Sequence, residues 1–168
     1  GVAYPNRIAL MRRIDDLLCR HVVEILGAGW PDTLRCAVNR RLTPAQMADY
    51  AAAARLTLNI GRDLDVANRR LSLPQATPGP RTFEVALSGS AQAFFVTGLE
   101  VCELFEPDTE ILLVDGAADI ARAIERSLDE PAAIEAIARR AQARALREHT
   151  YRHRAARLLD LSRLTVAA

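Results

Sequence analysis

Arg7 and Arg81 are the residues whose type and position first indicate chemistry, since each stands where the pattern predicts the first turn of a helix. A proline shortly before each one fixes how the chain enters that helix. A cation beside the positive end of a helix dipole costs about a few tenths of a kcal/mol unless an anion lies nearby. Because a guanidinium binds phosphate through two parallel hydrogen bonds, the pair indicates a phosphate or diphosphate site built from two loops. The alternative, equally open for either residue alone, is that each arginine reaches solvent or pairs with an acidic residue.

Glu84 stands three residues after Arg81, so the two side chains share one face of the predicted helix. A carboxylate at that place can accept both hydrogen bonds of a ribose diol, as acidic residues do in dinucleotide-binding folds. A glutamate in the first turn is also favoured by the helix dipole without any ligand. We expect Arg7, Arg81 and Glu84 on one rim, because the strand-to-helix loops of a parallel sheet open on the same edge.

The elements that must position these residues alternate along the chain, as apolar runs of strand type and of helical spacing follow one another. Strands are predicted near residues 22–26, 56–60, 92–97 and 111–114. Helices are predicted over residues 8–18, 44–54, 82–88, 99–105, 117–129, 131–148 and 151–164. The alternation predicts an α/β fold with one Rossmann-like parallel sheet, flanking helices and a helical C-terminal tail.

The composition sets further limits on function. The chain has 168 residues, a net charge of +1 and 50% apolar residues, which is typical of one globular domain and excludes disorder. Aromatic residues make up only 5%, and there is no basic excess, so we expect no nucleic-acid partner. No apolar run reaches the length of a membrane span, and we expect a cytoplasmic protein. Every basic residue is arginine, which excludes lysine chemistry and a Walker A loop.

Three cysteines, Cys19, Cys36 and Cys102, stand far apart in the sequence, without a CxxC motif. We expect them to be small buried apolar residues in a reducing compartment.

Residues 77–89, TPGPRTFEVALSG, resemble a segment of the CgeB-like branch of group 1 glycosyltransferases. The flanking segments resemble the same family in the same order: AYPNR at 3–7, GAGW at 27–30, LTPAQMADYAAAARLTLNIGR at 42–62, ELFEPDTEILLV at 103–114 and EHTYRHRAARLL at 148–159. The resemblance implies the C-terminal donor-binding domain of a GT-B glycosyltransferase, a hexosyltransferase-like enzyme.

The resemblance also implies roles for single residues. Glu84 matches the glutamate expected to bind the nucleotide ribose. Gly79 and Arg81 lie on the loop expected near the donor diphosphate, and Arg7 resembles a basic residue that faces the phosphates. Arg7 and Arg81 would then act in catalysis by stabilising the charge that develops on the leaving diphosphate.

At the end of the second predicted strand, Asn59, Gly61 and Arg62 are placed by the resemblance beside the same cleft. There they would contact the base or the sugar of the donor.

The family pattern also bears on what surrounds residues 1–168. It places the first strand of the domain and an acceptor-binding N-terminal domain ahead of Gly1. We therefore expect a single nucleotide-sugar-binding domain that is inactive by itself, with a nucleotide sugar as donor and an unidentified acceptor. Family members use no metal, so we expect no cofactor.

Two patterns offer a metal site as an alternative. Asp63 and Asp65 form a DxD motif, but two oxygen ligands alone make a poor magnesium site. His149 and His153 have a spacing that could hold zinc on one helix. Thr150, as an N-cap, would instead divide them between two helices. A further alternative is a non-catalytic Rossmann-like binding or interaction module, which would show no effect of a nucleotide.

Overall fold

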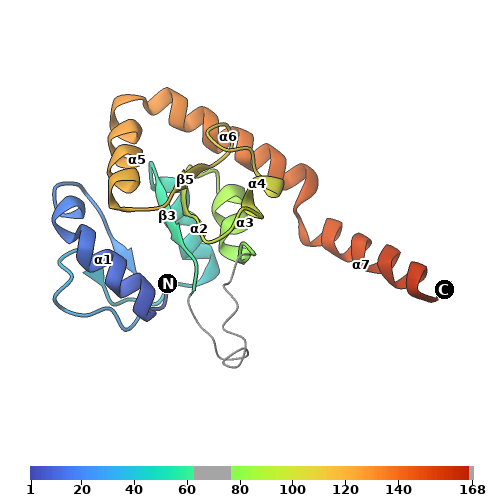
Figure 1. Ribbon diagram of the computed structural model, residues 1–168, viewed down its shortest axis with the longest axis horizontal. Helices are drawn as coiled ribbons and strands as arrows, with labels where there is room; N and C mark the ends of the chain where they lie inside the picture. The colour runs from blue at the N-terminus through green and yellow to red at the C-terminus, as the bar shows by residue number, and fades with distance from the viewer. Residues whose placement is uncertain (63–76, 167–168) are drawn as a thin grey trace.

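The computed structural model describes residues 1–62 and 77–166, with side chains as far as Arg163 (Figure 1). The DxD motif at Asp63 and Asp65 lies outside the described residues. The helices are α1 (Pro5–Leu18), α2 (Pro44–Ala53), α3 (Pro80–Leu87), α4 (Val101–Leu104), α5 (Ala117–Asp129), α6 (Pro131–Glu148) and α7 (Tyr151–Val166). The strands are β1 (Ile25–Leu26), β2 (Ala37–Val38), β3 (Thr57–Ile60), β4 (Gln92–Phe95) and β5 (Leu112–Val114).

A three-stranded parallel sheet forms the centre of the molecule. Its order is β3-β4-β5, with Thr57 opposite Gln92 and Ala93 opposite Leu112. Helix α3 lies between β3 and β4 in the chain, and α4 lies between β4 and β5, as parallel pairing requires. The α/β fold with parallel strands, flanking helices and a C-terminal helix is therefore confirmed, and it is consistent with the Rossmann-like half of a GT-B protein.

The prediction of one sheet containing a strand near residues 22–26 was wrong. Only Ile25 and Leu26 are in a strand, and they pair in parallel with β2, which we did not predict, in a separate two-stranded sheet. Val22 is fully exposed, so the first part of this β-branched run is a loop. Beta-branched residues favour a strand only where a partner is present, and Val22 lies beyond the paired residues.

Residues 1–3 extend the small sheet on its other side. The Gly1 amino group donates to the Leu26 carbonyl, the Ala28 amide donates to Gly1 O at 3.1 Å, and the Ala3 amide donates to Ala28 O at 3.1 Å. Val2 and Ala28 form a parallel bridge. The segment ahead of α1 is thus extended, and it runs in the same direction as β1.

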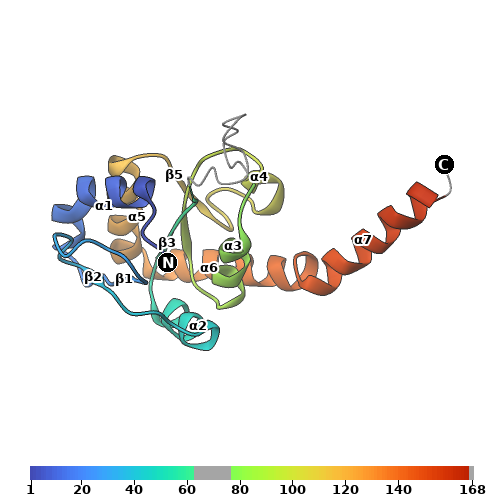
Figure 2. The same cartoon turned by 90° about the horizontal axis from the view of Figure 1, so that it is seen from below.

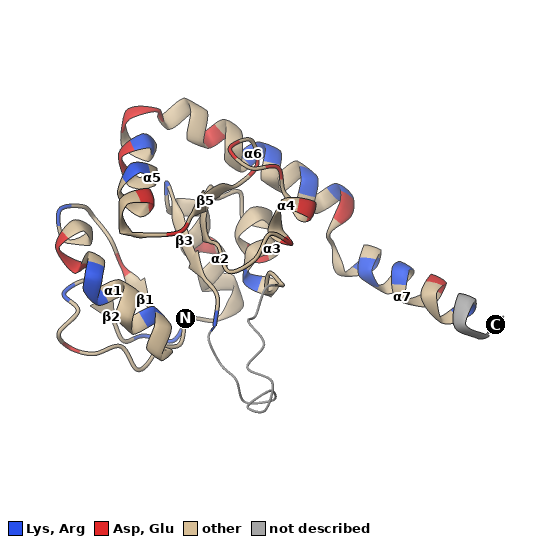
Figure 3. Cartoon of the chain, in the orientation of Figure 1, with Lys and Arg blue, Asp and Glu red and all other residues tan. Residues whose placement is uncertain are grey.

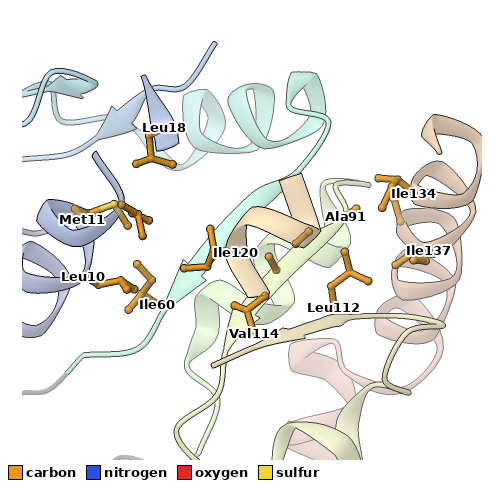
Figure 4. Packing of buried hydrophobic residues seen from close by; sticks show 14 of the residues in the cluster. Leu10, Met11, Leu18, Ile60, Ala91, Leu112, Val114, Ile120, Ile134 and Ile137 are labelled. Carbon is orange, nitrogen blue, oxygen red and sulfur yellow. The ribbon is translucent and has the colours of Figure 1, made fainter. Parts of the chain in front are cut away.

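Helix α1 joins the two sheets through one continuous apolar core. Figure 4 shows Leu10 and Met11 on the side of α1 that faces Ile60 and Ile120. Ile14 is 2% exposed and belongs to the same buried cluster. The cluster also contains Trp30 and Leu34 from the β1–β2 region. Side chains from both sheets therefore become buried in the same core when the chain folds.

The C-terminal helices lie differently from each other. Helix α6 packs against α3, whereas α7 extends away from the body (Figures 1 and 2). Figure 3 shows several basic residues along α7. The Arg154 guanidinium lies 4.3 Å from the centre of the Phe83 ring, which fixes the start of α7 on α3. In the part of the chain that the structure describes, no helix combines the length and apolar character needed to cross a membrane.

Shared burial of the α1 face leads us to expect that both sheets unfold in one transition. Trp30, the single tryptophan, is 6% exposed and reports on the small sheet, whereas far-ultraviolet circular dichroism reports on all helices. In urea, the two signals should have the same midpoint. Ile14→Ala should lower both midpoints together, by about 2–5 kcal/mol of unfolding free energy. Exposed Arg13 on the same helix provides the control, Arg13→Ala. Separate midpoints for the two signals would contradict a shared core.

Candidate functional site

The start of α1 is bound to the carboxyl end of β3 by Arg7. Its Nε donates to Ile60 O at 3.1 Å and to Gly61 O at 3.3 Å, and Nη2 donates to Ile60 O at 2.6 Å. Nη1 donates to Val2 O at 3.0 Å. Of the five N–H groups of the guanidinium, three face carbonyl oxygens, which leaves two that an anion could use. Arg7 therefore holds the loops in place and also carries charge at the edge of the sheet.

Asn6 adds a second connection at the same point. Its Nδ2 donates to Gly61 O at 3.2 Å. Gly61, the first residue after β3, thus accepts hydrogen bonds from two consecutive side chains of α1. This fixes the direction in which the chain leaves β3 toward Arg62.

At the start of α3, Gly79 is the N-cap and Arg81 lies in the first turn. Glu84 lies one turn further on, because the helix begins at Pro80, so our placement of Glu84 in the first turn was wrong. Arg81 Nη1 lies 2.8 Å from Glu84 Oε2, and the two side chains are 44% and 54% exposed. The predicted common face is confirmed, and without a ligand the two charges pair with each other.

We call Arg7, Arg62 and Arg81 the cationic rim. The positive charges of Arg62 and Arg81 repel that of Arg7. Burial lowers the pKa of the Arg7 guanidinium; Tyr4 raises it, and the charges of Arg62 and Arg81 lower it further. Arg7 on α1, Arg62 after β3 and Arg81 at the start of α3 are therefore close enough for their charges to interact. Such a concentration of positive charge favours an anion.

Asn59 lies directly below the rim, in a buried polar network. Its Nδ2 donates to Thr82 Oγ1 at 3.1 Å and to Gln92 Oε1 at 2.8 Å, and Gln92 Nε2 donates to Thr82 O at 3.2 Å. Asn59 is 7% exposed. The structure thus gives Asn59 a positioning role, since it fixes α3 on β3 and β4. Its contact with a base or sugar remains a prediction.

Two surface pockets are weaker candidates for the functional site than the cationic rim. One of about 280 Å³, lined by Arg55, Gly89, Ala91 and Pro131 among others, opens at the amino ends of β3 and β4. Ligands of parallel sheets bind at the opposite, carboxyl ends. Another of about 140 Å³ lies between α3 and α7 and includes Glu84 in its lining.

The two histidines of the tail lie in different elements. His149 ends α6, where its Nε2 lies 2.9 Å from Leu104 O, and its ring contacts Phe83 and Phe105. His153 belongs to α7, with Nδ1 2.8 Å from Thr150 Oγ1. The two histidines are therefore divided between two helices, as the position of Thr150 indicated. Within residues 1–62 and 77–166, no three His, Cys, Asp or Glu side chains gather closely enough to hold a metal ion.

A family model described as "Glycosyl transferase-like" matches residues 7–160, which include the described elements from α1 to most of α7. No curated protein and no solved structure matches the chain.

Replacement of Arg7 by methionine tests its role as a connection between α1 and β3. Arg7→Met keeps most of the aliphatic stem but leaves the carbonyls of Val2, Ile60 and Gly61 without this donor. We expect the free energy of unfolding to fall by about 1–3 kcal/mol. Arg13→Met, an exposed position on the same helix, should change it by less than about 0.5 kcal/mol. Urea denaturation measures both, and equal stability of the two variants would show that the Arg7 contacts contribute nothing.

Proposed function

The chain belongs to the glycosyl transferase-like family, and from that premise we propose that it binds a nucleotide-sugar donor at the cationic rim as part of a glycosyltransferase. The observation that carries this proposal is that Arg7 binds the carboxyl end of β3, where the charges of Arg62 and of Arg81, from the first turn of α3, act on it. The finer placement in the CgeB-like branch and a hexose as the transferred sugar belong to the same proposal.

The diphosphate of the donor is the group that this rim suits. Arg81 lies in the first turn of α3, where its guanidinium and the positive end of the helix dipole act on one anion. Gly79 at the N-cap has no side chain, so the backbone is open to a ligand there. Arg7 offers its two remaining N–H groups from the other side.

For the ribose diol, Glu84 is the proposed partner. Its carboxylate is paired with Arg81 in the structure and is about half exposed, so an incoming ligand can reach it. On binding, the diphosphate would take over the Arg81 guanidinium while the ribose hydroxyls donate to Glu84. The ion pair is thus exchanged for two contacts with one ligand, and no charge is left without a partner. An exposed pair of this kind contributes only about 0–1 kcal/mol, so its loss is a small obstacle.

The reaction that these groups support is transfer of the sugar to an acceptor hydroxyl or amine. The bond from the anomeric carbon to the diphosphate oxygen breaks, and its electron pair remains on the leaving nucleoside diphosphate. Arg7, Arg62 and Arg81 stabilise that growing negative charge, which is electrostatic catalysis by groups already in place. The acceptor atom attacks the anomeric carbon and loses its proton to a base outside the rim. No step of this scheme needs a metal ion.

A second domain and a further strand are part of this proposal. The acceptor and its base would come from a domain ahead of Gly1. Residues 1–3 already form a ladder with residues 26–28, and Arg7 binds the end of β3. An extended segment ahead of Gly1 would therefore run between β1 and β3 and join the two sheets into one.

A non-catalytic binding module is the second candidate function. The observation that favours it is that Arg81 and Glu84 satisfy each other and Arg7 binds carbonyl oxygens, so the rim is stable without a ligand. Nucleotide binding distinguishes the two candidates.

Glu84→Gln tests the ribose contact. The substitution keeps the shape of the side chain and removes its charge, so we expect nucleotide affinity to weaken by about 1–3 kcal/mol. The melting temperature should stay nearly unchanged, because Glu84 is exposed. Isothermal titration of the full chain with UDP, GDP and dTDP measures the affinities. The matched control is Glu135→Gln, which removes an exposed Glu–Arg pair with Arg139 on α6. Unchanged affinity for every nucleotide that the unmodified chain binds would argue against Glu84 as the ribose ligand.

Arg81→Ala tests the diphosphate contact. Only the diphosphate offers an anion, so the loss of affinity should be larger for the nucleoside diphosphate than for the nucleoside. Added salt should weaken diphosphate binding to the unmodified chain more than to the variant, because ions screen the guanidinium. The control is Arg139→Ala, and the measurement is the same titration at two ionic strengths. An equal loss for nucleoside and diphosphate would place the phosphates elsewhere.

A further inference from the structure

Cys19 and Cys36 lie side by side, although they stand far apart in the sequence and we expected them to be small buried apolar residues. Their Sγ atoms are 3.4 Å apart, and both residues are half-buried. That expectation failed because 17 residues separate the two cysteines in the sequence and only the packing of α1 against the β1–β2 region brings them together. The site is independent of the cationic rim and of the proposed function.

The backbone of both cysteines is held by hydrogen bonds. The Cys19 amide donates to Asp15 O at 2.9 Å and caps α1, and Cys36 O accepts from the Ile25 amide at 2.8 Å beside the ladder of β1 and β2. A disulfide bond is about 2.05 Å long, so the sulfur atoms must approach by about 1.4 Å. Rotation of the two side chains can supply such an approach while the backbone hydrogen bonds remain.

Arg35 holds the segment around Cys36 on the end of α1. Its Nε lies 2.8 Å from Asp15 Oδ2, its Nη2 lies 2.5 Å from Asp16 Oδ1, and its backbone amide donates to Asp15 Oδ1 at 3.2 Å. Asp15 Oδ1 also lies 4.0 Å from Cys19 Sγ. Asp15 and Asp16 of α1 are thus both bound to Arg35, the neighbour of Cys36, and these contacts hold the two thiols together.

We propose that Cys19 and Cys36 form a thiol–disulfide site, which low-molecular-weight disulfides such as oxidised glutathione convert into an intramolecular disulfide. The Cys19 thiolate attacks one sulfur of glutathione disulfide and releases one glutathione thiolate. The Cys36 thiolate then attacks Cys19 Sγ and releases the second. The two protein thiols lose two protons and two electrons, and one glutathione disulfide becomes two glutathione thiols, so atoms and electrons balance.

The groups around Cys36 set the pH dependence of the closing step. Burial raises the pKa of the Cys36 thiol to about 11, with further contributions from the Cys19 thiol and Asp15, while the Arg35 charge acts in the opposite sense. Its thiolate is therefore scarce at neutral pH. Because the thiolate is the attacking species, closure should be faster at pH 9 than at pH 7.

The bond would fasten the end of α1 to the start of β2. Both elements contribute to the core that unites the two sheets, so the disulfide restricts the unfolded chain and slows separation of the small sheet from α1. Cys102 lies in α4 and takes no part.

The experiment is incubation of the folded full chain with oxidised glutathione between pH 7 and pH 9. We expect two of the three thiols to disappear in a thiol assay, the mass to fall by two hydrogen atoms, and a tryptic peptide to join Cys19 to Cys36. The melting temperature should rise by roughly 5–10 °C and return when a reductant is added. Cys102→Ser is the matched control and should behave in the same way apart from its missing thiol.

Positioning by Arg35 is tested by Arg35→Gln, which should slow closure without changing its product. A lasting mixed disulfide with glutathione on Cys19 or Cys36, three remaining thiols, or a cross-link through Cys102 would each overturn the proposal. If the variants Cys19→Ser or Cys36→Ser fail to fold, the tryptic peptide map of the unmodified chain still shows which cysteines are cross-linked. A cross-link that forms only in urea would also overturn it, since the folded contact would then have no role.

Discussion

The hydrogen bonds from Arg7 to the carbonyl oxygens of Ile60 and Gly61 are the interaction on which the geometry of the rim depends. They connect residues 53 and 54 positions apart and place the start of α1 against the end of β3. Carbonyl groups at the end of a strand need donors, and a charged donor is among the strongest available. One arginine thus completes the backbone of the sheet and also brings positive charge to the edge where ligands of parallel sheets bind.

The polar and charged groups of such a site have hydrogen-bond or ion-pair partners before any ligand binds. Asn59, Thr82 and Gln92 hold α3 from below through buried hydrogen bonds, and Arg81 pairs with Glu84 above them. The buried network is rigid, because loss of one partner leaves another polar atom without one. The exposed ion pair costs little to exchange. Binding of a nucleoside diphosphate would therefore reorganise surface side chains and leave the supporting layer unchanged.

Local signals account for what the sequence predicted well. Helices α5 and α6 have the bounds that we predicted, because apolar spacing and Pro131 act within a few residues. Gly89 follows the C-cap of α3 with a φ of 75°, the left-handed conformation that glycine adopts readily after a helix. The predicted starts of the helices that contain Arg7 and Arg81 led us to expect both residues at one edge of the sheet. Pairing of β1 with β2, the contacts of Arg7 and the approach of Cys19 to Cys36 depend on segments that meet only in the folded chain. The periodicity of the sequence cannot predict these contacts between segments that lie far apart in the chain.

The most direct measurement of the central claim is an NMR titration of the arginine Nε–H resonances with a nucleoside diphosphate and, separately, with its nucleoside. If the rim binds the diphosphate, the resonances of Arg7, Arg62 and Arg81 shift together with one dissociation constant, and the nucleoside leaves those of Arg7 and Arg62 in place. The resonance of Arg139, paired with Glu135 on α6, should not move with either ligand. Shifts spread over arginines of α6 and α7, with the three rim resonances unmoved, would contradict a diphosphate site at the end of β3.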